Sequence, residues 1–482
     1  MKFVQPSAIP LWAALLPLFF LLGALAYNVG WVFGDDAVAG SNQLILLASA
    51  FFAAGVAAFF GRRFSDLFDG VANNLREAGK AMIILLLIGA LSGTWLVSGV
   101  IPTLIAYGVD LLDPSYFLVA AVLFCSVVSM ATGSSWSTSA TVGIALMGVG
   151  QALGFPAPVV AGAVISGAYF GDKLSPFSDT TNLAPAMAGT DLFTHIRYMT
   201  ITTVPSYLVT LLFFIGYTLW FPVEEANISL SWLNTLRETM NLTPWLLLVP
   251  VASLGLMLFR VDALVAVAFG AAAGAVAALW AQPEFIVSLA GEGIPAAHAA
   301  YAGIVRALYD TVQVPSSDPI VADLLQSKGM GGMLSTVWLI ISAMAFGGVM
   351  EAAGFLTRIT QSLVSLAHSA AGLIGATLAT CGLINITAGD QYLAIVVPGR
   401  MFKDAYRERG LAPENLSRCL EDSGTVTSAL VPWNTCGAYQ SATLGVATGE
   451  YFVYAVFNWV SPIMSWIIAL IGFRIRKLNS QE

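Results

Sequence analysis

The sequence predicts an all-α polytopic membrane protein, built from inverted-topology repeats of transmembrane helices with re-entrant hairpins and broken helices. Three observations point to it: a charge-poor composition, a one-sided distribution of Lys and Arg, and polar segments set within apolar sequence. Of the 482 residues, 57% are hydrophobic and 10% are charged, whereas an average soluble domain is about 25% charged. The mean hydropathy is +0.80. Such a chain suits a surface that faces lipid.

The same composition excludes several classes of protein. The 20 Lys and Arg and 28 Asp and Glu residues are too few to cover soluble domains of this total length. A net charge of −8 without a basic run argues against nucleic-acid binding. The four cysteines, Cys125, Cys381, Cys419 and Cys436, form no CxxC pair and have no histidine at metal-ligand spacing. We therefore expect neither a zinc site nor a disulfide framework.

Apolar stretches along the chain predict the transmembrane helices. The first follows a lone Lys2 and lacks the basic flank of a typical signal peptide, so we expect a retained span rather than a removable leader. It is long enough to cross about 30 Å of hydrocarbon. The predicted helices cover residues 9–28, 42–60, 80–100, 116–132, 157–171, 199–221, 243–259, 262–281, 333–350, 370–388 and 451–472.

The basic residues predict the topology. If Arg62 and Arg63 are cytoplasmic, 16 of the 20 Lys and Arg residues, including Arg418, fall on that side. Lys173 lies at membrane depth, and Arg237, Arg306 and Lys328 lie outside. This positive-inside pattern places both termini in the cytoplasm. Three histidines fall in predicted loops or near span ends and are given no role: His195, His298 and His368.

A weak internal repeat appears when the sequence is shifted by 255 to 256 residues. Residues 93–99 then match 348–354, and 175–180 match 431–436, with a proline in register. Residues 152–162 carry no Lys or Arg, whereas 400–418 carry five, so the halves are expected to have opposite orientations. The predicted divisions are N-terminal helices 1–79, a first repeat 80–221, connecting helices 222–298, an outward connector 299–332, a second repeat 333–472 and a cytoplasmic tail 473–482.

Four polar segments interrupt the apolar sequence: 132–141, 171–182, 386–392, and 421–428 with its continuation to 436. Irregular backbone at membrane depth requires surrounding protein or a water-filled cavity. The first and third segments predict re-entrant hairpin tips. The second and fourth predict unwound helices, because Pro176 and Pro432 each remove a backbone donor.

Freed carbonyls, hydroxyls and carboxylates together form an oxygen-rich shell that suits a hard cation such as Na⁺. For any single hydroxyl, capping or bonding within a helix is the more common role, but four such clusters at repeat-related positions favour the ion site. The candidate substrate-binding residues are Ser135, Ser137, Thr138, Ser178, Thr180, Asn182, Thr425, Asn434 and Thr435. The expected Na⁺ ligands are Asp179, Asp422 and Asn434.

Five carboxylates lie in or beside the predicted membrane region: Asp172, Asp179, Glu351, Asp390 and Asp422. There an unpaired charge costs at least about 2.5–3.5 kcal/mol. Lys173 is the one basic side chain expected at that depth, so the remaining acids must be protonated or hold a cation. Burial disfavours a charged carboxyl and a bound cation favours it, so one group can exchange H⁺ for Na⁺.

These acids are given different roles in ion and proton coupling. Asp179 and Asp422 are the leading candidates, with Asp172 as a further one. Glu351 is either a proton relay or a polar group at a helix end, and Asp390 either couples ions or accepts backbone donors at its hairpin tip. Lys173 either pairs with a carboxylate or extends to the cytoplasmic interface.

The segment Gly167–Ala184, with its run GAYFGDKLSPFSDTTNLA, resembles the signature of NhaC-type Na⁺/H⁺ antiporters. Residues 346–351, 388–392, 421–424 and 431–434 are also similar to that family, and the resemblance extends to about residue 470. It implies a multi-pass exchanger of the inner (cytoplasmic) membrane, within a wider group of ion-coupled transporters. Some relatives are thought to exchange organic solutes such as malate and lactate with Na⁺ and H⁺.

Two functions are therefore carried forward. The first is exchange of Na⁺ for H⁺, with these ions and the lipid bilayer as partners, no resident cofactor, and a homodimer left open. The alternative is Na⁺/H⁺-coupled exchange of an organic solute. An organic anion would need cationic groups in the site, whereas Lys173 is a single cation against five acids, which favours a cation as the main substrate. An enzyme is not expected, because neither an HExxH nor a GxSxG motif with a matching partner occurs. A passive channel suits paired broken helices less well than alternating access does.

Overall fold

The computed structural model describes residues 9–223, 236–314 and 325–478. Within these residues, eight helices are long and apolar enough to cross a membrane. Each predicted stretch coincides with a helix: α1 (Leu11–Tyr27), α2 (Ser41–Phe59), α3 (Phe64–Val97), α5 (Pro114–Thr132), α8 (Ala157–Leu174), α10 (Leu192–Trp220), α12 (Leu248–Leu258), α13 (Ala263–Ala281), α17 (Leu334–Ala352), α19 (Ala370–Thr387) and α24 (Val456–Leu470). Of these, α8, α12 and α24 are not among the eight. The predicted all-α polytopic membrane fold is therefore confirmed.

Further helices lie where the sequence predicted no span, because hydropathy alone does not detect short or polar helices. They are α4 (Val100–Leu111), α6 (Ser135–Thr138), α7 (Ile144–Ala152), α9 (Asp179–Ala188), α14 (Pro283–Ser288), α15 (Ala296–Tyr309), α18 (Phe355–Leu366), α20 (Gln391–Glu408), α21 (Pro413–Cys419), α22 (Thr435–Leu444) and α23 (Thr448–Tyr451). The predicted connector 299–332 holds most of α15 and the antiparallel strands β1 (Val312–Gln313) and β2 (Gln326–Ser327). Its residues 315–324 lie outside the described part.

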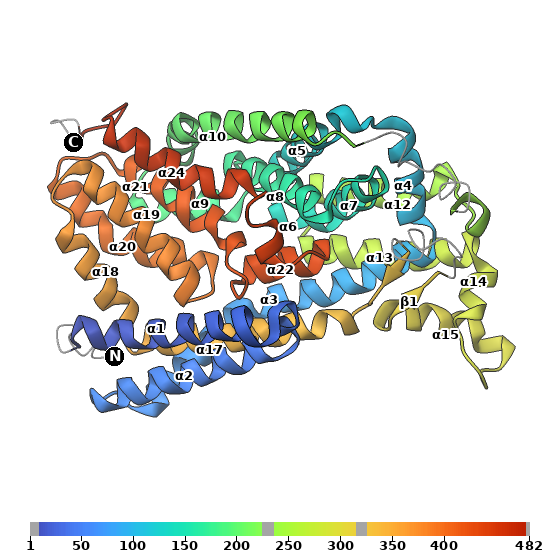
Figure 1. Cartoon of the computed structure of the whole chain (residues 1–482), viewed down its shortest axis with the longest axis horizontal. Coiled ribbons are helices and arrows are strands. Elements are labelled where there is room, and N and C mark those ends of the chain that lie inside the picture. Colours follow the sequence, from blue (N-terminus) through green and yellow to red (C-terminus); the bar gives the residue numbers. More distant parts are fainter. Residues whose placement is uncertain (1–8, 224–235, 315–324, 479–482) are drawn as a thin grey trace.

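The helices form two groups with the broken segments between them. Helices α1, α2, α3 and α17 pack side by side along one edge of the molecule, and α13 also packs on α3 (Figure 1). In the other group α5 packs on α8, and α10 packs on α24. The polar helices α6 and α22 lie between the groups (Figure 1).

The two stretches that the sequence repeat relates, α3 and α17, run in opposite directions. Gly70, near the start of α3, lies against Gly348, near the end of α17. Gly89, near the end of α3, lies against Gly329, just before α17 begins. Glycine permits this close helix contact because it has no Cβ.

The first and third polar segments break their helices in the same way. Gly133 ends α5 with a φ of 72°, and Gly389 follows α19 with a φ of 67°. The next residues, Ser134 and Asp390, each cap the following helix by accepting a hydrogen bond from the backbone three residues later. Glycine suits the break itself, because Gly133 and Gly389 are in the left-handed conformation that glycine adopts readily.

The second and fourth polar segments also share their local structure. After Pro176 the chain resumes as α9 at the N-cap Ser178, and after Pro432 it resumes as α22 at the N-cap Asn434. The spacing between these positions is that of the sequence repeat. The two segments thus share their local structure, while the inverted repeat and the domain limits remain predictions.

We expect Gly348→Ala to destabilise the fold by about 1–3 kcal/mol, the usual cost of overpacking a tight interior. An added Cβ would lie 2.7 Å from the Cα of Val71 and 2.8 Å from the carbonyl oxygen of Gly70. Neither backbone atom can move without separating α3 from α17. Thermal unfolding in detergent measures the effect. The matched control is Gly55→Ala in α2, where nothing lies within 4 Å; equal midpoints for the two variants would contradict the prediction.

Candidate ion site and a buried charge cluster

The four polar segments meet at a cavity of about 660 Å³. Its lining includes Ser134, Ser135, Trp136 and Ser137 from the first, Asp172, Ser178, Asp179, Thr180 and Asn182 from the second, Asp390, Gln391 and Tyr392 from the third, and Thr435 and Cys436 from the fourth. Tyr439, further along α22, also lines it. The rings of Trp136 and Tyr439 stack with centroids 3.9 Å apart. Segments distant in sequence thus bring carboxylates and hydroxyls to one space.

Asp172 is a firmly held carboxylate of the cavity wall. It lies in the last turn of α8 and is buried. Its Oδ2 accepts hydrogen bonds from the backbone N–H of Ser135 at 3.0 Å and from the Ser135 hydroxyl at 2.6 Å. These bonds to the charged form offset part of the cost of burying it. Asp172 therefore presents an oriented carboxyl group to the cavity.

Asp179 and Asp390 line the same cavity in different settings. Asp179 occupies the first turn of α9 and is exposed. Asp390 is buried, and its Oδ1 accepts a hydrogen bond from the Leu393 N–H at 2.9 Å, which caps α20. Of its two predicted roles, the bond to a backbone donor is the one seen here.

Exposed charged residues surround the mouth of the cavity, and several are already paired. Lys80 donates to Asp262 at 2.7 Å, and this bond lowers the pKa of the Asp262 carboxyl. The Arg260 guanidinium lies over the Phe177 ring, 4.2 Å from its centroid. The basic side chains at the mouth thus have partners of their own.

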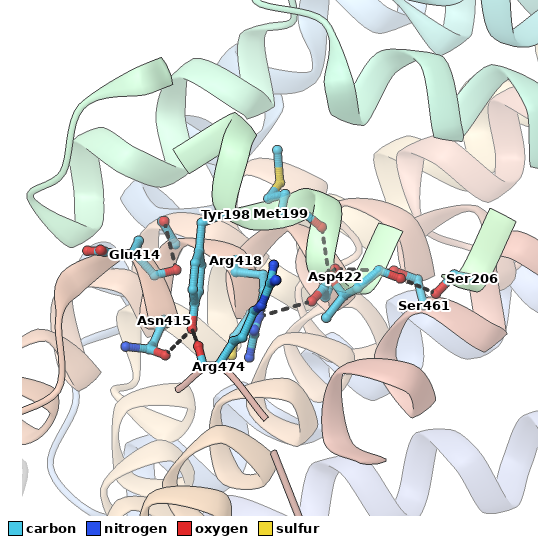
Figure 2. Close-up of polar contacts among 12 residues, drawn as sticks. Tyr198, Met199, Ser206, Glu414, Asn415, Arg418, Asp422, Ser461 and Arg474 are labelled. Atoms are coloured by element: carbon cyan, nitrogen blue, oxygen red, sulfur yellow. Dashed lines mark hydrogen bonds and ion pairs between the residues drawn. The ribbon is translucent and has the colours of Figure 1, made fainter. Parts of the chain in front are cut away.

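Asp422 lies in a separate, fully buried cluster (Figure 2). It belongs to the π-helical turn Leu420–Thr425. Its Oδ1 accepts from the Lys173 ammonium, from Thr202 at 3.0 Å and from Ser461 at 3.3 Å. Its Oδ2 lies 3.7 Å from Nε of Arg418. The cluster therefore holds Asp422 between two cations.

The cluster corrects one sequence expectation and selects one of the two roles expected for Lys173. Arg418, which the sequence placed among the basic residues of the cytoplasmic side, is fully buried within the protein, so Lys173 is not the one buried cation. Lys173 pairs with Asp422 rather than extending to the interface. Glu421, which the sequence analysis did not single out, is also fully buried, and neither carboxyl oxygen has a hydrogen-bond partner in the described structure. The contact between Arg418 and Asp422 could have been predicted from their spacing, because side chains four residues apart on a helix are neighbours.

The three expected Na⁺ ligands are not brought together. Asp179 lines the cavity, whereas Asp422 and Asn434 are absent from its described lining. Asn434 instead caps α22 and donates to the side-chain oxygen of Asn385 at 3.1 Å. In the ranges that the structure covers, no three His, Cys, Asp or Glu side chains are arranged around a metal position. A Na⁺ site there would have to combine carboxylates with hydroxyl and carbonyl oxygens.

Some of the other predicted site residues line the cavity and others do not. Ser135, Ser137, Ser178, Thr180, Asn182 and Thr435 line it, whereas Thr138 and Thr425 do not. Glu351 lies in the last turn of α17, exposed and outside the cavity lining, which matches its helix-end alternative. His195 lies near the start of α10, as one of its two predicted positions has it, and is buried with Nδ1 2.7 Å from the Ser417 hydroxyl.

Sequence comparison assigns the family. The profile described as "Na+/H+ antiporter family" matches residues 6–181 and 167–473. The chain belongs to the Na⁺/H⁺ antiporter family. Membership places it among transporters rather than catalysts, and its apolar helices make it a multi-pass membrane protein.

The chain is similar to three curated antiporters over most of their lengths. The chain is 33% identical to the Na⁺/H⁺ antiporter NhaC of Alkalihalophilus pseudofirmus, over 88% of this chain and 90% of the relative. It is 32% identical to NhaC of Bacillus subtilis, over 89% and 91%. It is 34% identical to the malate-2H⁺/Na⁺-lactate antiporter of Bacillus subtilis, over 89% of each.

Proposed function

We propose that this protein exchanges Na⁺ for H⁺ across the cytoplasmic membrane in an alternating-access cycle. The observation that carries the proposal is the cavity at which four broken segments bring Asp172, Asp179 and Asp390 together. Family membership and two relatives named as Na⁺/H⁺ antiporters support it.

The cavity chemistry suits competition between the two ions. Na⁺ is a hard cation that prefers oxygen ligands, and the hydroxyls of Ser135, Ser178 and Thr180 lie in the same wall as the carboxylates. A bound Na⁺ favours the ionised carboxylate, whereas a proton neutralises it. Since one group cannot hold both, loading Na⁺ releases H⁺, and the reverse returns the transporter. No resident cofactor is needed for this cycle.

Asp422 is assigned a role different from that of a Na⁺ ligand. Lys173, its ion-pair partner, directly follows Asp172 in the last turn of α8. A change in the charge of Asp172 is therefore felt by Lys173, and through it by Asp422. We assign the Lys173–Asp422 pair to coupling between cavity occupancy and the packing of α8 against the turn Leu420–Thr425.

The same proposal sets the orientation. Lys80 and Arg260 lie at the cavity mouth and belong to the basic residues that the positive-inside rule places in the cytoplasm. The conformation described is then open to the cytoplasm, with both termini on that side of the inner membrane. Two inverted halves, and a homodimer as the assembly, remain predictions of the sequence.

Purified protein in liposomes with a pH gradient is expected to move protons when Na⁺ alone is added. Asp179→Asn should lower that Na⁺-driven flux by at least about tenfold, because a Na⁺ ion bound in the cavity then lacks one compensating negative charge. The control is Asp404→Asn, an exposed acid paired with Arg407 on α20. A silent wild-type protein, or unchanged flux in Asp179→Asn, would contradict the proposal.

Organic-solute exchange is the second candidate, and the cavity size favours it. About 660 Å³ with the aromatic side chains Trp136, Tyr392 and Tyr439 in its wall is within the usual range for small-molecule sites. The malate-2H⁺/Na⁺-lactate antiporter is one relative. If this function holds, the same liposomes stay silent with Na⁺ and respond when malate or lactate is added.

A further inference from the structure

A continuous set of contacts joins Asp422 to the C-terminal end of the described chain. It begins at Arg418, whose side chain is fully buried and whose Nε lies 3.7 Å from Oδ2 of Asp422. Within the described structure, neither that oxygen nor any guanidinium nitrogen of Arg418 has a hydrogen-bond partner. The position of Arg418 therefore depends on what packs against it.

Tyr198 packs against Arg418. The guanidinium carbon lies 4.9 Å from the centroid of the Tyr198 ring, and that of Arg476 lies 5.3 Å from it. Such cation–π contacts are stronger where water is excluded, and Tyr198 is buried. Its hydroxyl is 2.6 Å from Oδ1 of Asn415 and 2.8 Å from the carbonyl oxygen of Arg474 (Figure 2). The ring is thus fixed from the C-terminal side.

The C-terminal residues are in turn bonded to the segment that leads into α21. The N–H of Ala412 donates to the Arg476 carbonyl at 3.1 Å, and the N–H of Leu478 donates to the Gly410 carbonyl at 2.8 Å. The Asn415 amide also donates to the Arg476 carbonyl, at 2.7 Å. These bonds tie the tail to the element that carries Arg418.

Two further features mark this attachment as specific. Arg476 forms an ion pair with Glu414 in the first turn of α21, at 2.9 Å. Arg474 has a φ of 51°, a left-handed conformation that is strained for a residue other than glycine. The strained residue is the one whose carbonyl accepts from Tyr198. The surrounding contacts hold it in that conformation.

We propose that residues 473–478 form a C-terminal clamp, and that Tyr198 and Arg418 are positioning residues through which it acts on Asp422; this inference rests on the proposed exchange function. The clamp fixes Tyr198, and Tyr198 holds Arg418 beside Oδ2. Asp422 then keeps one compensating cation when Lys173, which bonds Oδ1, shifts with cavity occupancy. Without the clamp, Asp422 depends on Lys173 alone, and the release of Lys173 becomes slow.

The test compares Tyr198→Phe and a chain ended at Gly472 with the wild-type protein. Tyr198→Phe keeps the ring over Arg418 and removes the hydroxyl contacts with Asn415 and Arg474. The matched control is Tyr207→Phe on the same helix, which removes a hydroxyl 2.8 Å from that of Ser126 and keeps a ring stacked on Phe170. Each protein is reconstituted into liposomes, and all except the truncated chain have the full length.

Two measurements are made on each protein. Hydrogen–deuterium exchange reports the opening of residues 413–425 whether or not the protein transports Na⁺. Both clamp variants should exchange there at least about fivefold faster, the factor expected for loss of one buried hydrogen bond. Na⁺-driven proton flux should show a maximal rate lowered about fivefold or more with a KM for Na⁺ within about twofold of wild type, because the cavity is untouched. Tyr207→Phe should match wild type in both.

A role for Arg418 itself is tested by conservative replacement. Arg418→Lys keeps a cation and should retain part of the maximal rate, whereas Arg418→Gln should lose it. Unchanged deuterium uptake in both clamp variants would overturn the clamp. Faster uptake with an unchanged maximal rate would overturn its action on exchange. A wild-type protein that moves no protons with Na⁺ contradicts the proposed function instead, and the uptake measurement then still decides the clamp.

Discussion

Replacing Asp422 with asparagine is expected to destabilise the protein by about 3–5 kcal/mol and to abolish Na⁺-driven proton flux, because it leaves buried cations without their counter-charge. Lys173 and Arg418 are fully buried, and both are paired with this carboxylate. Thermal unfolding in detergent and flux in everted vesicles measure the two effects.

A second variant separates stability from transport. In the double variant Lys173→Gln with Asp422→Asn, one uncompensated cation is gone, so part of the lost stability should return while flux stays absent. Asp404→Asn is the control, since its ion pair with Arg407 is exposed and such pairs contribute at most about 1 kcal/mol. Asp422→Asn with wild-type stability would contradict the buried-cluster account.

Asp172→Asn is expected to lower Na⁺-driven flux by at least about 100-fold, a loss of about 2.7 kcal/mol, while the protein still folds. The amide oxygen can still accept from the N–H and hydroxyl of Ser135, so the local bonds survive. The charge that compensates a bound cation is removed. Initial rates in proteoliposomes measure the effect.

The control for Asp172 is Ser135→Ala. It removes the hydroxyl donor at 2.6 Å and keeps both the carboxylate and the backbone donor. We expect this variant to lose about tenfold in flux, the scale of one hydrogen bond to a charged group. Asp172→Asn transporting at the rate of Ser135→Ala would show that the charge at residue 172 is not required.

The fold was largely predictable because apolar length is a direct signal of a membrane span. Helices such as α5 and α13 coincide closely with the predicted stretches. The breaks at Gly133 and Gly389 were also visible, since glycine followed by a capping residue interrupts apolar sequence there. Polar helices such as α20 were missed, because their burial comes from packing within the protein.

The site was predictable in its composition but not in its grouping. Asp172, Asp179 and Asp390 do meet at one cavity. Asp422, however, joins Lys173 from α8, a pairing across sequence that residue types alone do not reveal. The burial of Arg418 was not predicted, because a positive-inside count assigns each basic residue to a side of the membrane and says nothing of its packing. Which acid faces which cation is decided by tertiary packing.

The central claim is that Na⁺ and H⁺ displace one another at the cavity carboxylates. Isothermal titration of purified protein with Na⁺ at a series of pH values tests it most directly. With one proton displaced for each ion, the apparent Na⁺ affinity should weaken about tenfold for each unit that the pH falls through the competing range, and Asp172→Asn should remove that dependence. A Na⁺ affinity that stays constant with pH in the wild-type protein would contradict the account.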